Sequence, residues 1–493
     1  MWMILGLQVL AEALTVAVIL RLDMLPGKFV LVLVGIMALL VLATGLMMFI
    51  PAKKKAGTGR RVTACILALI IVIGCVLITK VVTDTYSTVS NVTSAEINTA
   101  SRDSYILVRT EDPAQTLQDA ADYTFAAIEH YNEEQTAVAV DMITQAISKE
   151  PALKYYEQGI AMAEALFAKD VDALIMNGAS AALLLEEEGY SDFFERVRVL
   201  SVVPYQQEDQ PDETEPTEEV QKKDITNTPF IVYVSGSDTR SSVLSVSRSD
   251  VNILMVVNPV SKQVLLLNTP RDYYIPNPAG NGKLDKLTHC GLYGVDCSME
   301  ALEGLYGIDI THYGQINFKG FETLIDAIGG ITVVAEHSFK TEAGYIQKGE
   351  NFLNGHQALF FARERYNVSG GDNGRGRNQM RVITAVIEKM TNGTTIISNY
   401  AGILDSLEGT FSTDLQMSDI SSLVKMQLSD MAKWNVKSFA VIGTNGSEKT
   451  YSAPGHYASV MYPNDAAVAQ ASQLVQKVLD GAVITDEDLV INQ

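Results

Sequence analysis

Positive charge is scarce in this chain. Its 493 residues include 37 lysines and arginines against 58 aspartates and glutamates, which gives a formal net charge of −21. Nucleic-acid binding depends on a basic face that neutralises phosphates, so this balance argues against a general nucleic-acid binder. We therefore expect no nucleic-acid partner, and any anion site must be a local basic cluster. The length predicts two or three domains.

Cysteine is also rare, with four residues in the whole chain. Cys65 and Cys75 lie in an apolar run, where packing is the expected role. Cys290 and Cys297 are seven residues apart, a spacing that matches no metal-binding motif. If that part of the chain is exported, oxidation is chemically permitted there. The spacing leaves a local disulfide and two free thiols both open.

Long apolar runs occupy residues 3–20, 29–50 and 62–78. Each approaches the roughly 20 residues that an α-helix needs to cross a bilayer. Gln8 and Glu12 interrupt the first run, and a carboxyl group in lipid requires a partner. A cleaved signal peptide is the alternative for this run, but no basic segment precedes it and two further runs follow. We predict three transmembrane helices within residues 1–80.

The segment 51–61, "PAKKKAGTGRR", lies between the second and third runs and carries five basic residues. Under the positive-inside rule this loop is cytoplasmic. The N-terminus is then also cytoplasmic, and the chain beyond about residue 80 is exported. The sequence thus predicts a multi-pass protein of the cell membrane whose acidic bulk is extracytoplasmic.

Two regions precede the C-terminal half. Residues 84–205 mix helical periodicity, at 114–135 and 151–170, with strand-like runs at 171–177 and 196–203. They predict a small α/β or α+β accessory domain, which offers no nucleophile paired with a base and so favours a structural or interaction role. Residues 206–227 are acidic and contain two prolines, and they predict a linker or an exposed loop.

Strands and helices alternate in residues 228–485. Short β-rich runs at 229–236, 251–258 and 263–270 are typical of a buried sheet, and 318–330 and 380–390 carry helical spacing. The alternation predicts a layered α/β domain whose loops at the strand ends form its working edge.

Charged residues crowd these predicted strand ends. The segment 360–366, "FFARERY", is interpreted as a strand that points two guanidinium groups to one face. The glycine-rich segment 370–379, "GGDNGRGRNQ", is interpreted as a loop before a helix. The charged set comprises Asp238, Arg240, Arg248, Asp250, Arg271, Asp272, Arg363, Arg365, Arg375 and Arg377.

So many arginines in an acidic protein indicate a specific polyanion, because the planar guanidinium binds phosphate oxygens in pairs. The glycines of 370–379 would let backbone amides approach the same oxygens, next to a helix N-terminus. The segment is neither a Walker loop nor a dinucleotide fingerprint, and alone it equally suits a surface turn. Asp238 and Asp250 could hold Mg²⁺, or each could simply pair with an arginine.

Four segments resemble, in order, the motifs of the LytR-CpsA-Psr (LCP) family. The resemblance covers residues 228–395 strongly and continues more loosely to about 480. The three spans and the accessory domain are most similar to the CpsA-type branch, which is associated with capsular polysaccharide. The segments are "SRSDVNILMVVNPVSKQVLLLNTPRDYYI", "KLDKLTHCGLYGV", "INFKGFETLIDAIGGITV" and "GHQALFFARERYNVSGGDNGRGRNQMRVITAVIEK".

The resemblance implies an α/β/α layered catalytic domain with a central mixed sheet. It also implies a phosphotransferase that moves a glycopolymer from an undecaprenyl-pyrophosphate carrier onto peptidoglycan through a phosphodiester bond. The implied cofactor is Mg²⁺ or Mn²⁺. The expected partners are the lipid-linked glycopolymer, peptidoglycan, the cell membrane and other capsule-assembly proteins.

The resemblance also assigns residues by motif. Asp238 and Asp250 match the metal-associated aspartates, whereas Arg240 and Arg377 are added here from charge and position. Asn378 stands where many family members have an arginine, so which of Arg377 and Asn378 faces the ligand is left open. The pyrophosphate-contacting set is Arg248, Arg271, Arg363, Arg365, Arg375 and Gln379.

The expected catalytic residues are Asp250, Arg271, Asp272 and Arg375. Either Asp272 or Asp250 could act as the general base, and the sequence does not choose between them. Apolar runs at 253–257, 265–267 and 323–331 could line a groove for the lipid tail, or they could be ordinary core. Two other functions stay open: a non-catalytic binder that regulates polymer assembly or cell-envelope gene expression, and a lipid-pyrophosphate hydrolase.

Overall fold

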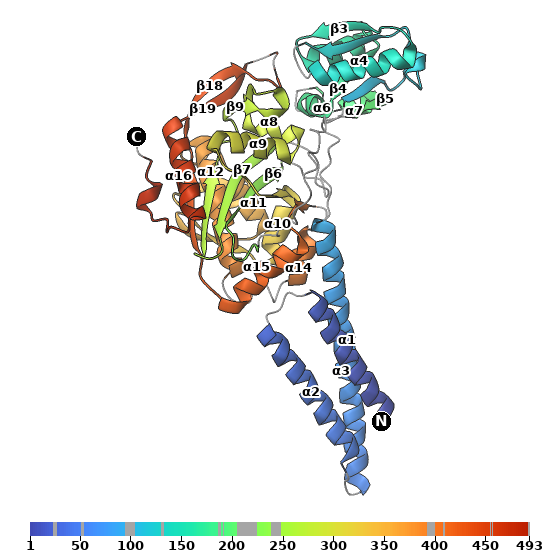
Figure 1. Ribbon diagram of the computed structural model, residues 1–493, viewed down its shortest axis with the longest axis vertical. Helices are drawn as coiled ribbons and strands as arrows, with labels where there is room; N and C mark the ends of the chain where they lie inside the picture. The colour runs from blue at the N-terminus through green and yellow to red at the C-terminus, as the bar shows by residue number, and fades with distance from the viewer. Residues whose placement is uncertain are drawn as a thin grey trace, which may run out of the picture.

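The computed structural model contains a helical bundle, a small sheet domain and a larger layered domain (Figure 1). The residues it describes are 1–22, 27–50, 54–93, 104–129, 133–185, 189–190, 192–204, 224–237, 248–391, 400–407, 410–453, 455 and 457–491.

The bundle consists of α1 (Trp2–Leu22), α2 (Gly27–Phe49) and α3 (Lys54–Thr93). Within the described residues, three stretches are long and apolar enough to cross a membrane: Trp2–Leu20, Gly27–Phe49 and Thr58–Lys80. They coincide with the predicted spans. The end of α2 and the start of α3 lie at the end of the bundle farthest from the rest of the chain (Figure 1). The helix α3 continues to Thr93, so the expected domain start at residue 84 falls inside it.

The polar residues of the first span face inward. Gln8 Nε2 donates a hydrogen bond to Glu12 Oε1 at 2.8 Å, and Thr44 Oγ1 of α2 donates to Gln8 Oε1 at 2.9 Å. All three side chains are buried between the helices. Because Gln8 binds the carboxyl group and is itself bound by Thr44, Glu12 is compatible with a membrane-spanning α1.

The accessory domain contains a five-stranded mixed sheet in the order β3-β2-β4-β1-β5. The helix α4 (Glu133–Ile147) covers one face, while α5 (Gly159–Ala168) and α6 (Gly178–Leu185) cover the other. Successive residues of a strand point to opposite faces of the sheet. Ile106 accordingly packs with Ile143 of α4 on one face, and Leu107 packs with Met162 of α5 on the other. The remaining elements are β1 (Ser104–Arg109), β2 (Thr124–Ile128), β3 (Ala152–Tyr156), β4 (Ala173–Asn177), α7 (Phe193–Arg196) and β5 (Val197–Val203).

Two helices predicted here were wrong in part. The stretch 114–135 contains β2, and the stretch 151–170 begins with β3. The run "TFAAI" of β2 is almost wholly buried, and a central strand covered on both faces loses the alternation that identifies it. The predicted strands at 171–177 and 196–203 correspond to β4 and β5.

The larger domain contains a six-stranded mixed sheet in the order β16-β11-β6-β7-β8-β17. The strands β6 and β11 are parallel, as are β8 and β17, whereas β7 runs antiparallel to both of its neighbours. Three of the strands match the predicted runs. They are β6 (Phe230–Ser237), β7 (Ser249–Asn258) and β8 (Gln263–Asn268), and the others are β11 (His312–Asn317), β16 (Phe411–Thr413) and β17 (Asn435–Ala440).

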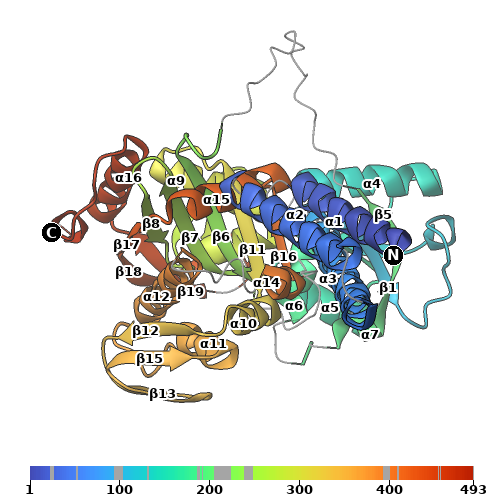
Figure 2. The same ribbon diagram turned by 90° about the horizontal axis from the view of Figure 1, so that it is seen from below.

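Helices cover both faces of this sheet, which makes the domain an α/β/α sandwich (Figure 2). Leu254 and Val256 of β7 pack toward the layer of α8 (Leu287–Cys290), α9 (Val295–Tyr306) and α16 (Asp465–Leu479). Ile253 and Val257 pack toward α12 (Gly371–Thr391) and α15 (Met417–Asp430). The predicted fold class is therefore confirmed. The other α-helices among the described residues of this domain are α10 (Phe318–Ala327), α11 (Gly355–Arg363) and α14 (Tyr400–Leu407).

Small two-stranded sheets surround the sandwich. They comprise β9 (Tyr274–Asn277) with β10 (Lys283–Lys286), β12 (Ile331–Ala335) with β15 (Gly349–Leu353), β13 (Phe339–Thr341) with β14 (Gly344–Ile346), and β18 (Gly443–Lys449) with β19 (Tyr457–Pro463). Cys290 and Cys297 are buried free thiols. Of the two alternatives left open for this pair, a local disulfide or two free thiols, the structure has the free thiols.

Candidate functional site

Several strand ends meet at one edge of the large sheet. Ser237 at the end of β6 pairs with Ser249 at the start of β7, and Asn268 at the end of β8 pairs with Ile253. The strand β11 ends at the same edge because it runs parallel to β6. This register brings Asp250 of β7 next to the segment that follows β8.

Arg271 and Asp250 form an ion pair at this edge. Arg271 Nη1 donates to Asp250 Oδ1 at 2.7 Å, and its Nε lies 3.9 Å from Asp272 Oδ1. Lys286 Nζ of β10 lies 2.5 Å from the same Asp272 oxygen. Burial lowers the pKa of Arg271, but the carboxylates of Asp250 and Asp272 outweigh it and the net shift is upward. The guanidinium is thus held charged between the two carboxylates.

The segment 370–379 is helical rather than a loop, because α12 begins at Gly371. Arg375 Nη2 lies 2.5 Å from Asp372 Oδ1, three residues earlier in the same helix. Arg375 and Gln379 are each 8% exposed and share one face of α12, as positions four apart must. Both line the same pocket as Asp250.

The glycines of this segment serve close packing. A Cβ on Gly376 would lie 2.4 Å from the side-chain amide of Asn268, at the end of β8. A Cβ on Gly374 would lie 2.5 Å from the carbonyl oxygen of Ser369. Gly370 and Gly371 have φ values of 86° and 55°, a region that favours glycine. These glycines therefore seat α12 against the sheet edge and bring Arg375 to Asp250.

Arg363 and Arg365 come from the end of α11, not from a strand as predicted. Arg363 is the last residue of α11, and Arg365 lies two residues later, after the C-cap residue Glu364. The Arg363 guanidinium carbon lies 4.3 Å from the centre of the Phe318 ring, a cation–π contact that holds it over the start of α10. Both arginines line the pocket of Asp250 and Arg375 despite the change in secondary structure.

The pocket that these residues line has a volume of about 260 Å³. Its charged wall is cationic apart from Asp250. Burial lowers the pKa of Arg375, Asp372 opposes this, and the nearby charges of Arg271 and Arg365 lower it further. An anion in the pocket would relieve this mutual repulsion. The polar and charged lining residues are Ser235, Asp250, Asn317, Arg363, Arg365, Tyr366, Arg375 and Gln379.

An apolar pocket of about 440 Å³ adjoins it between the sheet and the helices α12 and α15. Met255, Val257 and Leu324 line it, so two of the three apolar runs considered for a groove contribute to it. The third run, 265–267, is buried in the core. The two pockets share lining residues, which are Val234, Ile316, Phe321, Val382 and Ile383.

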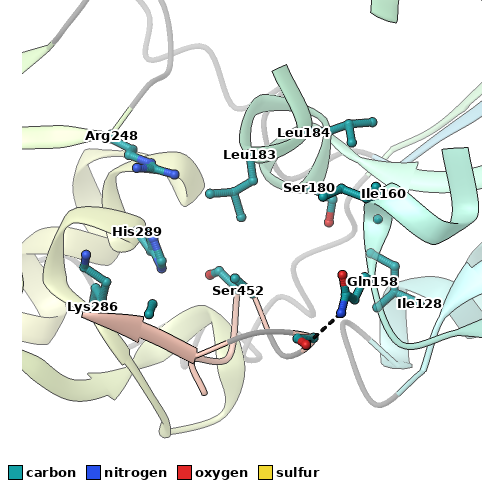
Figure 3. A pocket seen from close by; sticks show the side chains of 14 residues that line it. Ile128, Gln158, Ile160, Ser180, Leu183, Leu184, Arg248, Lys286, His289 and Ser452 are labelled. Carbon is teal, nitrogen blue, oxygen red and sulfur yellow. Dashed lines mark hydrogen bonds between the residues drawn. The ribbon is translucent and has the colours of Figure 1, made fainter. Parts of the chain in front are cut away.

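Arg271 and Asp272 lie next to Asp250 but do not line the pocket themselves, and three other residues considered for ligand contact lie elsewhere. Arg377 Nη2 donates to the carbonyl oxygen of Ser369 at 2.8 Å, and its Nε lies 3.6 Å from Glu336. Asn378 is buried and donates to the carbonyl oxygen of Phe361. Arg377 and Asn378 were the two candidates to face a ligand at this position, and neither of them lines the pocket. Arg248 lines a different cavity, between the accessory and catalytic domains (Figure 3).

The LytR_cpsA_psr family model matches residues 201–465, more than half of the chain. The chain belongs to the LytR_cpsA_psr family. The matched range contains the whole cationic pocket.

Several relatives carry a functional name. The polyisoprenyl-teichoic acid–peptidoglycan teichoic acid transferase TagU of Enterococcus faecalis is 35% identical over 218 residues, which is 43% of this chain and 71% of that protein. The TagU of Bacillus cereus is 33% identical over 210 residues, 42% of this chain and 67% of that protein. Among solved structures, TagV of B. subtilis is 24% identical and covers 52% of this chain and 99% of its own, with a TM-score of 0.43.

In this LytR_cpsA_psr protein, Asp238 and Arg240 lie outside the described residues. Within the described part, no group of three or more acidic, histidine or cysteine side chains could hold a metal ion. Mg²⁺ commonly uses only one or two carboxylates together with substrate phosphates. Asp250 fits that role, because its carboxylate lines a pocket suited to a phosphate-bearing ligand.

The sequence interpretation missed two charged residues of this site. Asp372 was overlooked because the segment was treated as a loop, whereas helical spacing would have paired it with Arg375. Lys286 lies on β10, and only the β9–β10 hairpin brings it to Asp272. In the sequence, Lys286 appears only as a lysine of the motif "KLDKLTH", and the motif does not indicate that Asp272 is its partner.

Proposed function

We propose that this protein transfers a glycopolymer from a polyprenyl-pyrophosphate carrier to peptidoglycan. The observation that carries the proposal is the junction of a cationic pocket with an apolar one through shared lining residues. A ligand that fills both needs an anionic head and a long apolar tail, which is the chemistry of a lipid-linked pyrophosphate. The names of the TagU relatives support a glycopolymer–peptidoglycan transferase in general.

The apolar pocket lies toward the membrane helices. Leu423 and Met426 of α15 line it, and α15 lies beside the bundle (Figure 1). Lys28 Nζ, near the start of α2, donates to the carbonyl oxygen of Ser429 at the end of α15 at 2.7 Å. A lipid tail in this pocket would therefore have a short path from the bilayer, which supports a membrane-anchored carrier as donor.

Within the cationic pocket, Arg363, Arg365 and Arg375 would bind the pyrophosphate oxygens, with Gln379 as a neutral donor. Arginine suits this task because its fork makes paired, charge-assisted hydrogen bonds to phosphate. Charge builds on the leaving lipid phosphate as the pyrophosphate bond breaks. Positioned cations that stabilise this charge supply most of the catalysis in phosphoryl transfer.

Asp250, with Asp238, would hold Mg²⁺ or Mn²⁺ at the pocket wall. The ion, when bound, supplies positive charge against the phosphates. Arg271 binds Oδ1 of Asp250, and a metal ion would bind the other carboxylate oxygen. The role of Arg271 is then to orient Asp250 and to add charge next to the pyrophosphate.

The proposed membrane topology rests on the basic segment 51–61, at the turn from α2 to α3. Arg60 and Arg61 lie near the start of α3, at the end of the bundle away from the catalytic domain. With this turn in the cytoplasm, the N-terminus is cytoplasmic and the catalytic domain is extracytoplasmic. The polymer we propose is capsular polysaccharide or a similar anionic polymer, supported by the resemblance of the three spans and accessory domain to the CpsA-type branch.

The proposal is tested with the full chain in lipid nanodiscs, incubated with a polyprenyl-pyrophosphate saccharide, Mg²⁺ and peptidoglycan. We expect muramidase digestion of the wall to release the saccharide joined by a phosphodiester. Arg363→Ala should abolish this product. Free saccharide phosphate would indicate a hydrolase, and intact bound donor would indicate a non-catalytic binder; either result contradicts the proposal.

A further inference from the structure

A cavity of about 180 Å³ lies between the accessory domain and the catalytic domain (Figure 3). Gln158 Nε2 of the accessory domain donates to the carbonyl oxygen of Gly455 at 2.7 Å and bounds the cavity on one side. The catalytic domain contributes Arg248, Lys286, His289 and Ser452. The accessory wall is mainly apolar and includes Ile128, Ile160, Leu183 and Leu184.

His289 is held in one orientation by a buried carboxylate. Asp285 is fully buried, and its Oδ1 lies 2.7 Å from His289 Nδ1. Burial raises the pKa of Asp285, but His289, Ser452 and Asn277 outweigh it, so the net pKa is lowered and the group is ionised. Asp285 therefore binds the Nδ1 side of the ring and directs Nε2 away from the carboxylate; in the neutral ring with its proton on Nδ1, Nε2 is the proton acceptor. The ring lines the cavity (Figure 3).

The cavity is connected to the phosphate pocket by a short chain of ion pairs. Lys286 Nζ lies 2.5 Å from Asp272 Oδ1, and Arg271 lies between Asp272 and Asp250. The backbone N–H of Thr288, next to His289, donates to the carbonyl oxygen of Arg271 at 2.8 Å. The cavity lies on the α8 side of the sheet edge, and the phosphate and lipid pockets lie on the α12 side.

We propose that this cavity binds the acceptor saccharide and that His289 Nε2 takes the proton from its attacking hydroxyl. The inference rests on the proposed transferase function. In phosphoryl transfer the attacking and leaving oxygens are roughly in line. If the lipid phosphate leaves toward the apolar pocket, the acceptor must arrive from the opposite side, where this cavity lies. Lys286 and Arg248 suit an anionic group on the saccharide, and Leu183 suits the apolar face of a sugar ring.

The step balances in atoms and charge. The hydroxyl proton of the acceptor moves to His289 Nε2, and the acceptor oxygen forms a bond to the phosphorus that carries the polymer. The bond from this phosphorus to the bridging oxygen breaks. The electron pair leaves with that oxygen as polyprenyl phosphate, which Arg363 and Arg375 stabilise. The accessory domain, for which only a structural or interaction role was expected, thereby forms one wall of the acceptor site.

The test measures donor binding and initial transfer rate separately, with full-length chain in nanodiscs and a soluble peptidoglycan oligosaccharide as acceptor. His289→Gln should lower kcat about 100-fold or more, the usual size of a general-base effect, with donor affinity unchanged. Added imidazole should restore part of the rate in His289→Ala, which a purely structural histidine would not allow. Leu183→Asp should raise the acceptor KM about tenfold, a shift of about 1.4 kcal/mol.

Val199→Asp is the matched control, since Val199 is 48% exposed on the accessory domain and does not line the cavity. It should leave kcat and the acceptor KM unchanged. Full transfer by His289→Gln would overturn the inference. A Leu183→Asp variant that loses as much donor affinity as it loses transfer rate would also overturn it, because the cavity would then hold the donor. A wild-type chain that binds donor but transfers nothing would instead defeat the proposed function itself.

Discussion

Arg271 Nη1 donates to Asp250 Oδ1 across 2.7 Å, at the point where β7 begins and the chain leaves β8. The sequence predicted different roles for these two residues: Arg271 was expected to bind phosphate, and Asp250 was expected to bind a metal ion. Asp272, the other residue considered as a general base, is paired with Lys286 at 2.5 Å. Both carboxylates are therefore held in ion pairs with cationic side chains.

Replacement of Arg271 should reduce transfer strongly. We expect Arg271→Ala to lower kcat about 10²- to 10³-fold, the usual effect of removing one positioned charge donor. Arg271→Lys should recover little of the rate, because lysine cannot reproduce the geometry of the fork. Initial rates of wall attachment measure the effect, and a thermal unfolding midpoint close to wild type shows that folding is retained. Wild-type rates in either variant would contradict this role.

Two arginines of α12 offer a matched comparison. Arg375 lines the cationic pocket, whereas Arg377, two residues later, pairs with Glu336 and Ser369 outside it. Arg375→Ala should cost about 100-fold in kcat/KM, and Arg377→Ala less than about threefold. Steady-state kinetics on both variants, with donor concentration varied, decide the point. Equal losses would mean that Arg377 reaches the ligand after all.

The junction between the two pockets should control recognition of the lipid tail. Ile383 lines both pockets, so Ile383→Trp would narrow the passage between them. Overpacking of this kind typically costs about 1–3 kcal/mol, which corresponds to a roughly 5- to 150-fold loss of affinity for a long-chain donor. A short-chain, water-soluble donor serves as the control and should bind the variant as it binds wild type. Parallel weakening of both donors would argue against a tail in this pocket.

The proposed metal should act through Asp250. Asp250→Asn should raise the Mg²⁺ concentration for half-maximal activity at least about tenfold, since an amide is a weaker ligand than a carboxylate. Asp238→Ala should act in the same direction. Titration of activity with Mg²⁺ and with Mn²⁺ after chelator treatment measures the shift. Undiminished turnover in excess chelator would remove the metal from the account.

Acid should weaken the buried Asp285–His289 pair. The folded pKa of Asp285 is lowered, so the stability it contributes is present above its unfolded pKa of about 3.9 and is lost as pH falls through the folded value. Asp285→Asn should cost about 3 kcal/mol near pH 7, as expected when a buried pair loses one member. Thermal unfolding of wild type and variant between pH 7 and pH 3 should show the difference shrinking below about pH 4. A constant difference would contradict this assignment.

Long apolar runs allowed most of the catalytic fold to be predicted. The spans and the strands β6, β7 and β8 lie within a few residues of the predicted runs, because continuous apolar stretches of these lengths have few other uses. The strand predicted at Arg363 was wrong because periodicity does not separate a short buried helix from a strand. The local signal was the capping box of Asn354 and Gln357 at the start of α11.

The helical state of residues 371–379 was harder to predict. Glycine disfavours a helix interior, so Gly374 and Gly376 predict a loop from propensity alone. In the structure they allow α12 to approach Ser369 and Asn268 closely, and this tertiary contact overrides the propensity. The cavity at His289 was beyond sequence reasoning, because its second wall belongs to another domain.

The most direct test of the central claim follows a single phosphorus atom. The full-length chain is given a donor with ³²P only in the phosphate next to the saccharide, together with Mg²⁺ and peptidoglycan. We expect label to enter the wall in a phosphodiester, with one unlabelled polyprenyl phosphate released for each linkage. Label that stays with the lipid, or that appears only in free saccharide phosphate, would contradict it.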